Sequence, residues 1–524
     1  MVNRGAQSSQ DVGDRPAPLS AGPPAEPGPG AQNLAGAAIA AVVASLLILI
    51  GAAVVRNGWE HPYIALPAQG PPWGLSRHLS IVSVSELMWA ATILGGGGVA
   101  AGLAAIARGA RLPARLLLLI GLVATVAFVL LLPAGSDDAL YEATYGRIAV
   151  LGHSPYLMTP QQLVAKHDPV ALNTPLTWRT QFSLYGPLTT GLEWAAAKLG
   201  GTSAARIIFW LKLWNAIAFT VAALGLDRVL RSDTARRARA HLLWSANPLL
   251  LWVLVAAGHV DAFGAAAGVL GLVVARTRGP AGHASAARWF AAGLLVGVAV
   301  EVKVTYALFA LALAWACRRS LTAYASAGAG AAVAILPGYL WFGAPSISVL
   351  FGRDSLSSVD NFYQLFAGSY GQTIPEQTVV GALLFVVVGL LMLWRFPGEV
   401  PGLPAIRPAL ALSAAWLLLW PYTYPWYDAM AFCLLALYGA SRLDWVMLAQ
   451  LTIGVFALMP GNAGLPPQHA LAVITKDVIY WVTPVVLLLT AVALVALCLT
   501  RRWKMGEVSE PGEPPGLVAA VSER

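Results

Sequence analysis

The chain has 524 residues, of which 58% are hydrophobic and only 11% are charged, with a formal net charge of +8. A soluble protein has about 25% charged residues, so this composition excludes a soluble multidomain enzyme as well as a disordered or collagen-like chain. Apolar runs of about 20 residues recur along the chain without the alternation typical of a transmembrane β-barrel. We therefore predict an all-α polytopic membrane protein.

The predicted elements begin after a proline-rich stretch at residues 1–33, which is typical of a disordered tail. Three transmembrane helices are expected within residues 34–133, and residues 505–524 form a second polar tail. In total we expect about fourteen crossings. They lie near residues 34–55, 86–107, 115–133, 204–226, 240–257, 262–275, 288–301, 304–316, 321–341, 378–394, 409–420, 427–440, 445–459 and 477–499.

The positive charge predicts membrane topology and not nucleic-acid binding. Most arginines lie in short connections that fall on one side of the membrane when the N-terminus is placed inside, as cytoplasmic loops do. Both tails are therefore predicted to be cytoplasmic. The longer loops at residues 134–203 and 342–377 are then external, and the apolar stretch 185–199 within the first of them is expected to be an interfacial or re-entrant helix.

Three apolar runs are interrupted by polar residues where a membrane span would bury them. His259 and Asp261 lie near the middle of residues 240–275, Glu301 and Lys303 lie within residues 288–317, and an aromatic break follows at residues 420–428. If the chain folds back at each break, all three polar groups lie at the external face.

Charged residues within or beside a bilayer are costly and by default suggest a functional site. A structural interpretation stays open for each: Glu301 and Lys303 pair or extend toward water, and His259 and Asp261 cap the turn. The clustering of all three breaks on one face favours a common site.

The first external loop begins with two aspartates, Asp137 and Asp138, directly after a predicted span. At that place the pair is compatible with a helix N-cap followed by the first helical residue, where the helix dipole favours negative charge. It is equally compatible with a general base whose pKa is tuned by neighbouring charge.

Several common catalytic motifs do not occur in the sequence. It has no Walker A lysine motif, no HExxH or GxSxG, and no hydrophilic segment large enough for a nucleotide-sugar-binding Rossmann domain. A group-transfer enzyme of this kind has to receive its donor from the membrane, which a lipid-linked donor satisfies.

The first loop resembles a signature of the GT-C superfamily of membrane glycosyltransferases. The resemblance is greatest to the actinobacterial polyprenyl-phosphate-mannose-dependent α-mannosyltransferases. The residues that carry it are Asp137, Asp138, Tyr141, Gly146, Arg147, Gly152, Ser154, Pro155 and Tyr156, then Tyr185–Leu188, His259, Asp261, Lys303 and the Pro425–Tyr427 turn.

The resemblance implies cofactor-free, metal-independent, inverting transfer of a sugar, most readily mannose, from a polyprenyl phosphate to an envelope glycan or lipoglycan. Asp138, or alternatively Asp137, is the implied base, and the other aspartate is its hydrogen-bond partner or a ligand of the acceptor. Lys303 and Arg147 are the implied donor-phosphate ligands. The implied substrate-binding residues are Tyr141, Tyr156, Tyr185, His259, Asp261, Glu301, Trp426 and Tyr427, although the aromatic ones are also compatible with an interfacial belt.

The sequence analysis thus predicts a catalytic module at residues 134–430 and C-terminal transmembrane helices at residues 431–504. The enzyme is expected in the plasma membrane with its active site on the extracytoplasmic side, and its partners are the lipid-linked donor, the glycan acceptor and membrane lipids. The alternative function is a transporter or flippase, which also uses polar residues in broken helices. The absence of an internal repeat and the clustering at one face favour the enzyme over a transporter and over a purely structural subunit.

Overall fold

A computed structural model of the chain describes residues 28–55, 64–75, 79–276, 285–351, 358, 361–366, 374–398, 400–458 and 470–503. Within these residues the regular structure is helical and the only β pairing consists of isolated bridges, so the all-α prediction is confirmed. Six of the described helices are long and apolar enough to cross a membrane, and a bent helix pair makes a seventh. Five further apolar helices are shorter, so the expected count of fourteen stays a prediction. Residues 1–27 and 504–524 of the predicted tails lie outside the described residues.

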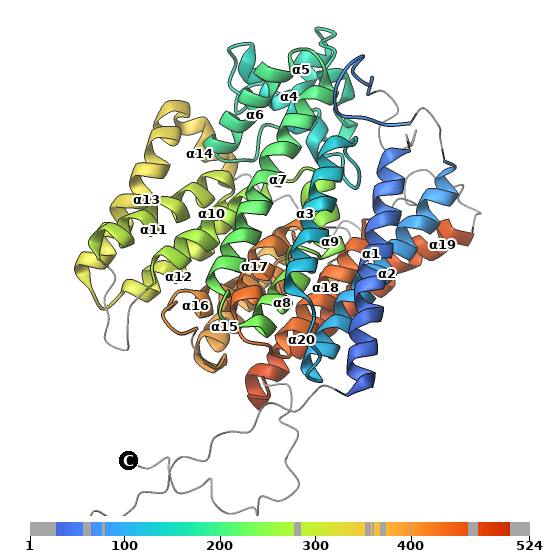
Figure 1. The fold of residues 1–524 in the computed structure, drawn as a ribbon. Helices are drawn as coiled ribbons and strands as arrows, with labels where there is room; N and C mark the ends of the chain where they lie inside the picture. The colour runs from blue at the N-terminus through green and yellow to red at the C-terminus, as the bar shows by residue number, and fades with distance from the viewer. Residues whose placement is uncertain are drawn as a thin grey trace, which may run out of the picture.

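The N-terminal part forms three long helices, as expected. They are α1 (Pro29–Val54), α2 (Ile81–Ala107) and α3 (Ala114–Leu130). The first begins earlier than the predicted boundary because Pro29 occupies its first turn, where a missing N–H costs nothing. It packs along α2 (Figure 1).

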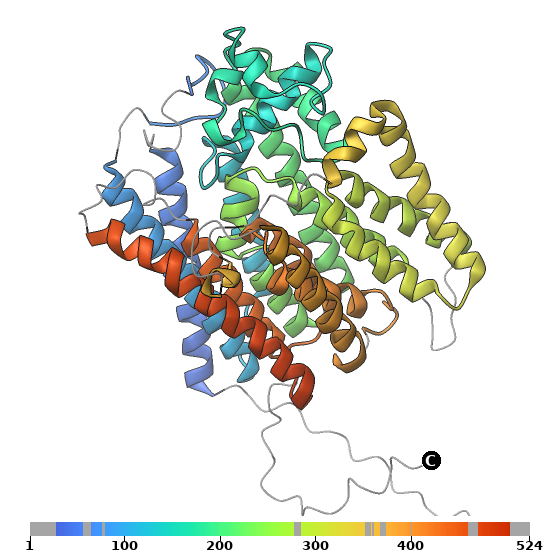
Figure 2. The same cartoon turned by 180° about the vertical axis from the view of Figure 1, so that it is seen from behind.

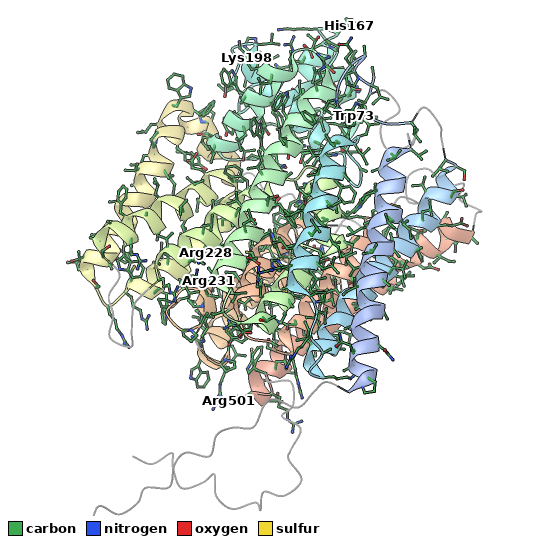
Figure 3. The ribbon with its side chains drawn as sticks, in the orientation of Figure 1. Trp73, His167, Lys198, Arg228, Arg231 and Arg501 are labelled. Carbon is green, nitrogen blue, oxygen red and sulfur yellow. The ribbon has the colours of Figure 1, made fainter. Side chains whose placement is uncertain are left out.

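The first long loop folds into a layer of short helices above one end of the bundle (Figure 1). This layer contains α4 (Asp138–Val150), α5 (Pro160–Val164), the 3-10 turns η1 (Ala171–Asn173) and η2 (Leu176–Trp178), and α6 (Pro187–Gly200). The last of these is the helix expected from the apolar stretch 185–199. Figure 3 places Lys198 and His167 at this end of the molecule and Arg501 at the other.

The helix α7 (Ala204–Val229) runs from this layer down through the bundle (Figure 1). It is followed by α8 (Thr234–Leu243), α9 (Pro248–Leu250), the π-helix η3 (Leu251–Ala256) and α10 (Asp261–Val274). The chain bends by 117° between Ala256 and Asp261, which confirms the predicted break around His259.

The second predicted break also interrupts a helix. The elements here are α11 (Ala286–Val302), the 3-10 turn η4 (Val304–Tyr306), α12 (Ala307–Cys317), α13 (Leu321–Phe342) and α14 (Ala344–Phe351). Lys303 stands in extended backbone between α11 and η4. The predicted loop 342–377 is described only in α14, Ser358, the 3-10 turn η5 (Phe362–Leu365) and the first residues of α15.

The C-terminal helices complete the bundle. They are α15 (Ile374–Arg395), α16 (Ile406–Leu419), η6 (Pro425–Asp428), α17 (Ala429–Leu437), α18 (Leu443–Ala457), α19 (Ala470–Asp477), η7 (Val478–Val482) and α20 (Thr483–Thr500). Figure 2 shows α15, α16 and α20 packed side by side on the back of the molecule. The third predicted break separates α16 from η6 and α17.

Candidate active site

The two aspartates lie at the start of α4, where the layer of short helices meets the bundle. Gly135 precedes them with a φ of +97°, a left-handed conformation that only glycine adopts without strain. Asp137 occupies the N-cap position and Asp138 the first helical position, as the capping interpretation predicts. The Asp137 side chain nevertheless makes no capping bond, and Ser136 Oγ instead accepts the Asp138 N–H at 3.1 Å. Neither carboxylate is therefore used to cap the helix.

His259 lies beside Asp138 although the two are far apart in sequence. Its Nδ1 atom is 3.4 Å from Asp138 Oδ2, and its ring is stacked on the Trp426 indole with 3.9 Å between centroids. The His259 side chain is 1% exposed, and neither ring nitrogen has a hydrogen-bond partner among the described residues. The first and third predicted breaks thus meet beside residues 135–138, which we call the aspartate turn.

Lys303 forms a buried ion pair with Asp261. Its Nζ donates to the two Asp261 carboxylate oxygens at 2.9 and 3.1 Å and lies 3.8 Å above the centroid of the Tyr427 ring. Tyr306 donates its hydroxyl proton to the Asp261 carbonyl at 2.7 Å. The second break is therefore joined to the other two, and we call Asp138, His259, Asp261 and Lys303 the aspartate–histidine cluster.

Glu301 points to a different partner from the one expected in the structural interpretation. Its Oε2 accepts the Leu188 N–H at 3.2 Å in the first turn of α6, and it forms no ion pair with Lys303. The start of α6 approaches the end of α11 so closely that a Cβ atom on Gly186 would lie 1.9 Å from the Glu301 carbonyl oxygen. Glycine at this position therefore permits the contact. Glu301 thus anchors α6 beside the cluster.

The predicted substrate-binding tyrosines of the first loop are buried in one group. Tyr141 and Tyr185 share a hydrogen bond of 3.0 Å between their hydroxyls. The Tyr156 hydroxyl donates to the Tyr185 carbonyl at 2.9 Å. All three are at most 6% exposed, as is typical of an internal wall and not of a lipid-facing aromatic belt.

A cavity of about 280 Å³ opens beside the two aspartates. Its lining residues are Gly135, Ser136, Asp137, Asp138, Trp178, Tyr422, Tyr424, Trp426 and Leu458. Four of these are aromatic, and the rings of Tyr424 and Trp426 are stacked 4.7 Å apart. No group of three or more His, Cys, Asp or Glu side chains in the described ranges is placed to hold a metal ion.

Three aromatic residues of the cavity were missed by the sequence analysis. Tyr422 and Tyr424 belong to the aromatic break at residues 420–428, so their neighbourhood to Trp426 was a usable signal. Trp178 lies in the 3-10 turn η2, and its ring contacts Tyr141 at 4.4 Å between centroids. Nothing in the sequence around Trp178 indicates that contact.

The surroundings of Asp138 raise the pKa of its carboxyl group to about 6. The largest cause is desolvation by burial, and the charge of Asp137 adds to it. Hydrogen bonding to Tyr141 and Ser136 and the positive charge of Lys303 oppose the shift. A carboxylate with a pKa near the working pH is suited to accept a proton and to release it again.

Two further buried carboxyl groups lie between α4 and α6. Burial raises the pKa of Glu142 and of Glu193 well above the usual range. Neither was singled out from the sequence.

The structure does not bring Arg147 together with Lys303. Arg147 Nε donates to Asp168 Oδ2 at 2.9 Å, and Asp168 Oδ1 accepts the backbone N–H groups of Val170 and Ala171. Arg147 also lies about 13.5 Å from Asp138 along the axis of α4, given a rise of 1.5 Å per residue. Its observed contacts hold the loop before η1.

Comparison with known proteins points to one family. The sequence profile described as "Alpha-(1->6)-mannopyranosyltransferase, N-terminal domain" matches residues 34–319, which is more than half of the chain. A protein of Mycolicibacterium smegmatis (strain ATCC 700084 / mc(2)155), described as a probable alpha-(1->6)-mannopyranosyltransferase, is 28% identical over 153 residues. That alignment covers 29% of this chain and 26% of the relative, so the chain spans about a quarter of the relative's length. The matched region contains the aspartate turn, His259, Asp261 and Lys303, and the chain belongs to the alpha-(1->6)-mannopyranosyltransferase family.

Proposed function

We propose that this protein transfers mannose from a polyprenyl-phosphate donor to an envelope glycan or lipoglycan, with inversion at the anomeric carbon. The observation that supports it best is the half-buried Asp138, which lines an aromatic cavity and lies 3.4 Å from His259. Family membership supports the choice of mannose. The reaction takes place on the extracytoplasmic side, where the layer containing α4, α5 and α6 is expected from the charge distribution.

In the proposed reaction, Asp138 removes the proton from an acceptor hydroxyl group. The resulting oxygen attacks the anomeric carbon of mannose, and the bond between that carbon and the phosphate oxygen breaks. The phosphate remains on the polyprenyl chain with the negative charge that this bond cleavage leaves on it. Because inversion gives an α-linkage, the donor sugar is β-linked.

Lys303 is the proposed source of positive charge for the leaving phosphate. Its charge already reaches Asp138, since it lowers the pKa of that carboxyl group. The same charge acts on a phosphate bound in the neighbouring cavity, where negative charge grows in the transition state. Asp261 and Tyr427 hold the ammonium group in place. Arg147 is not part of this proposal because it is paired with Asp168.

The aromatic residues of the cavity are proposed to hold the sugar. Ligand cavities usually have volumes of about 300–1,000 Å³, so a cavity near the lower end fits one sugar ring better than a long chain. The flat faces of Trp178, Tyr424 and Trp426 suit the apolar faces of a sugar, and the two aspartates suit its hydroxyl groups.

The test is a transfer assay with the full chain in membranes, using radiolabelled polyprenyl-phosphate-mannose and an oligomannoside acceptor. Asp138→Asn should lower the rate by about 10²–10⁴-fold, the usual contribution of a general base. Asp477→Asn, an exposed aspartate on α19, is the matched control and should transfer at the wild-type rate.

Two results would contradict the proposal. If Asp137→Asn, Asp138→Asn and the double variant all transfer at the wild-type rate, neither aspartate is the base. If the wild-type chain moves the lipid-linked donor across vesicles without transferring its sugar, the protein is a transporter.

A further inference from the structure

A buried lysine in α7 has no acidic partner among the described residues. Lys212 is 0% exposed and forms none of the ion pairs seen in the described part of the chain. Its Nζ instead donates to the carbonyl oxygens of Leu131 and Leu132 at 2.8 and 3.1 Å. Burying a lysine side chain without an acidic partner is costly, so this lysine has to serve something that an apolar residue cannot.

The two carbonyls that Lys212 binds follow directly after the last residue of α3. Carbonyls at a helix C-terminus have no partner within the helix and carry its partial negative charge, which a cation stabilises. These residues lead into Gly135 and then the two aspartates. Lys212 therefore fixes the start of the aspartate turn.

One turn further along α7, Asn215 fixes the bend at residues 257–260 between η3 and α10, which we call the histidine turn. Its Nδ2 atom donates to the Gly258 carbonyl oxygen at 2.5 Å, directly before His259. Gly258 has a φ of +85°, and a Cβ atom there would lie 3.1 Å from Lys212 Cγ. Residues three apart lie on the same face of a helix, so one face of α7 holds both turns.

The two turns are also joined to each other directly. The Ala134 N–H donates to the Ala256 carbonyl oxygen at 3.1 Å, and the backbone of Gly135 packs against the Trp252 indole. The Asp138–His259 distance of 3.4 Å is therefore set by backbone segments that α7 and η3 hold in place.

We propose that Lys212 and Asn215 are positioning residues that hold Asp138 against His259 in the geometry that catalysis requires. Neither touches the cavity, so they act through the two turns and not on substrate. The inference rests on the proposed function for its kinetic consequence, whereas its structural consequence can be measured without any substrate.

The kinetic experiment uses purified full-length protein with polyprenyl-phosphate-mannose and an oligomannoside. Lys212→Met keeps the length of the side chain but removes its donors, and Asn215→Leu keeps the shape of the amide. Each should lower kcat about 10- to 100-fold, because small displacements of catalytic groups cost this much. Both KM values should stay within about twofold, since ground-state binding is not altered. Lys212→Arg should recover most of the rate, and Lys198→Met, an exposed lysine on α6, is the matched control.

The pH profile separates positioning from simple loss of folded protein. If the aspartate turn moves away, Asp138 becomes better hydrated and its pKa falls from about 6 toward the ordinary value. The acid limb of kcat/KM should therefore shift to lower pH in Lys212→Met and Asn215→Leu. A lower amount of folded protein changes the height of the profile but leaves this limb in place.

The second experiment measures the turn itself. Ser136→Cys introduces a thiol at the cavity, whereas Cys317, Cys433 and Cys498 are buried. A maleimide should label this thiol several-fold faster when Lys212→Met or Asn215→Leu is also present than when neither is. This measurement stays valid if the wild-type chain transfers no mannose, in which case the proposed function fails and the positioning role is judged by labelling alone.

Unchanged kcat, acid limb and labelling rate in either folded variant would overturn the proposal. If Lys212→Met is not recovered as folded protein, Asn215→Leu decides, since it leaves the lysine and its two hydrogen bonds in place. A lower kcat with an unchanged acid limb and labelling rate would also overturn it.

Discussion

Two charged clusters in the helix bundle differ in how completely their polar atoms are paired. The arginine cluster consists of Asp227, Arg237, Arg239, His241 and Asp444 and connects α7, α8 and α18. Arg239 binds the two Asp444 oxygens at 3.0 and 2.5 Å and donates to the Leu435 and Tyr438 carbonyls. Both ring nitrogens of His241 have partners, which are Asp227 and Ser245.

The aspartate–histidine cluster is different in two respects. The ring nitrogens of His259 have no hydrogen-bond partner in the described ranges, whereas those of His241 both do. Asp138 also lines a cavity, whereas no residue of the arginine cluster lines the cavity beside the aspartates. From this difference we expect that the arginine cluster serves to join helices and that the aspartate–histidine cluster keeps polar atoms for a ligand.

The sharpest way to test this difference is to break the Arg239–Asp444 pair. Arg239→Met leaves the Asp444 carboxylate buried at 0% exposure without its partner. Removing one member of a buried pair costs about 3–5 kcal/mol, so the free energy of unfolding should fall by that amount. It can be measured by denaturing the purified chain with SDS in mixed micelles.

The double variant Arg239→Met/Asp444→Leu is the control for that measurement. It removes both charges, and such replacements are often close to neutral. Its stability should return toward the wild-type value, and transfer per folded molecule should be unchanged in both variants. A loss of transfer in the folded double variant would mean that the arginine cluster also serves catalysis.

The matching change in the other cluster should act on the reaction. Lys303→Met removes the charge proposed to stabilise the leaving phosphate, so kcat should fall by about 100-fold. Asp261 is then left buried and unpaired, and some stability is also lost. The double variant Lys303→Met/Asp261→Asn should regain stability without regaining activity. If Lys303→Met lowers only stability and leaves transfer per folded molecule unchanged, the two clusters are alike and Lys303 is structural.

The sequence predicts where the helices break because charge in an apolar run cannot stay in a span. This argument located the turns at His259 and Lys303, and both turns are present. The N-cap position of Asp137 was one of two interpretations left open, and Asp137 does occupy it, although its side chain makes no capping bond. Each of these features depends on residues that are close in sequence.

The sequence does not predict which polar groups meet, because partners are chosen by helix packing. Glu301 stands two residues from Lys303, yet Lys303 binds Asp261, which is 42 residues away. Arg147 has the right charge for a phosphate ligand, but Asp168 lies within its reach in the folded loop. Lys212 is a lone lysine in an apolar run, and only the arrangement of α3 against α7 gives it a role.

The smallest predicted effect concerns pH and distinguishes Asp138 from an ordinary surface aspartate. A general base has to be ionised, and burial raises the pKa of Asp138 to about 6, so kcat/KM should fall as pH decreases through 6. At pH 5 the loss is about tenfold relative to the plateau, because one proton binds per base.

Two neighbours of Asp138 fix the direction in which this acid limb can be moved. The Asp137 charge raises the pKa of Asp138, so Asp137→Asn should shift the limb to lower pH. Hydrogen bonding to Tyr141 lowers that pKa, so Tyr141→Phe should shift the limb to higher pH. Initial rates between pH 4.5 and 8 (chosen to bracket a pKa of about 6) measure both shifts. A limb that stays at the same pH in both variants would exclude Asp138 as the titrating group, since both neighbours shift the pKa of Asp138.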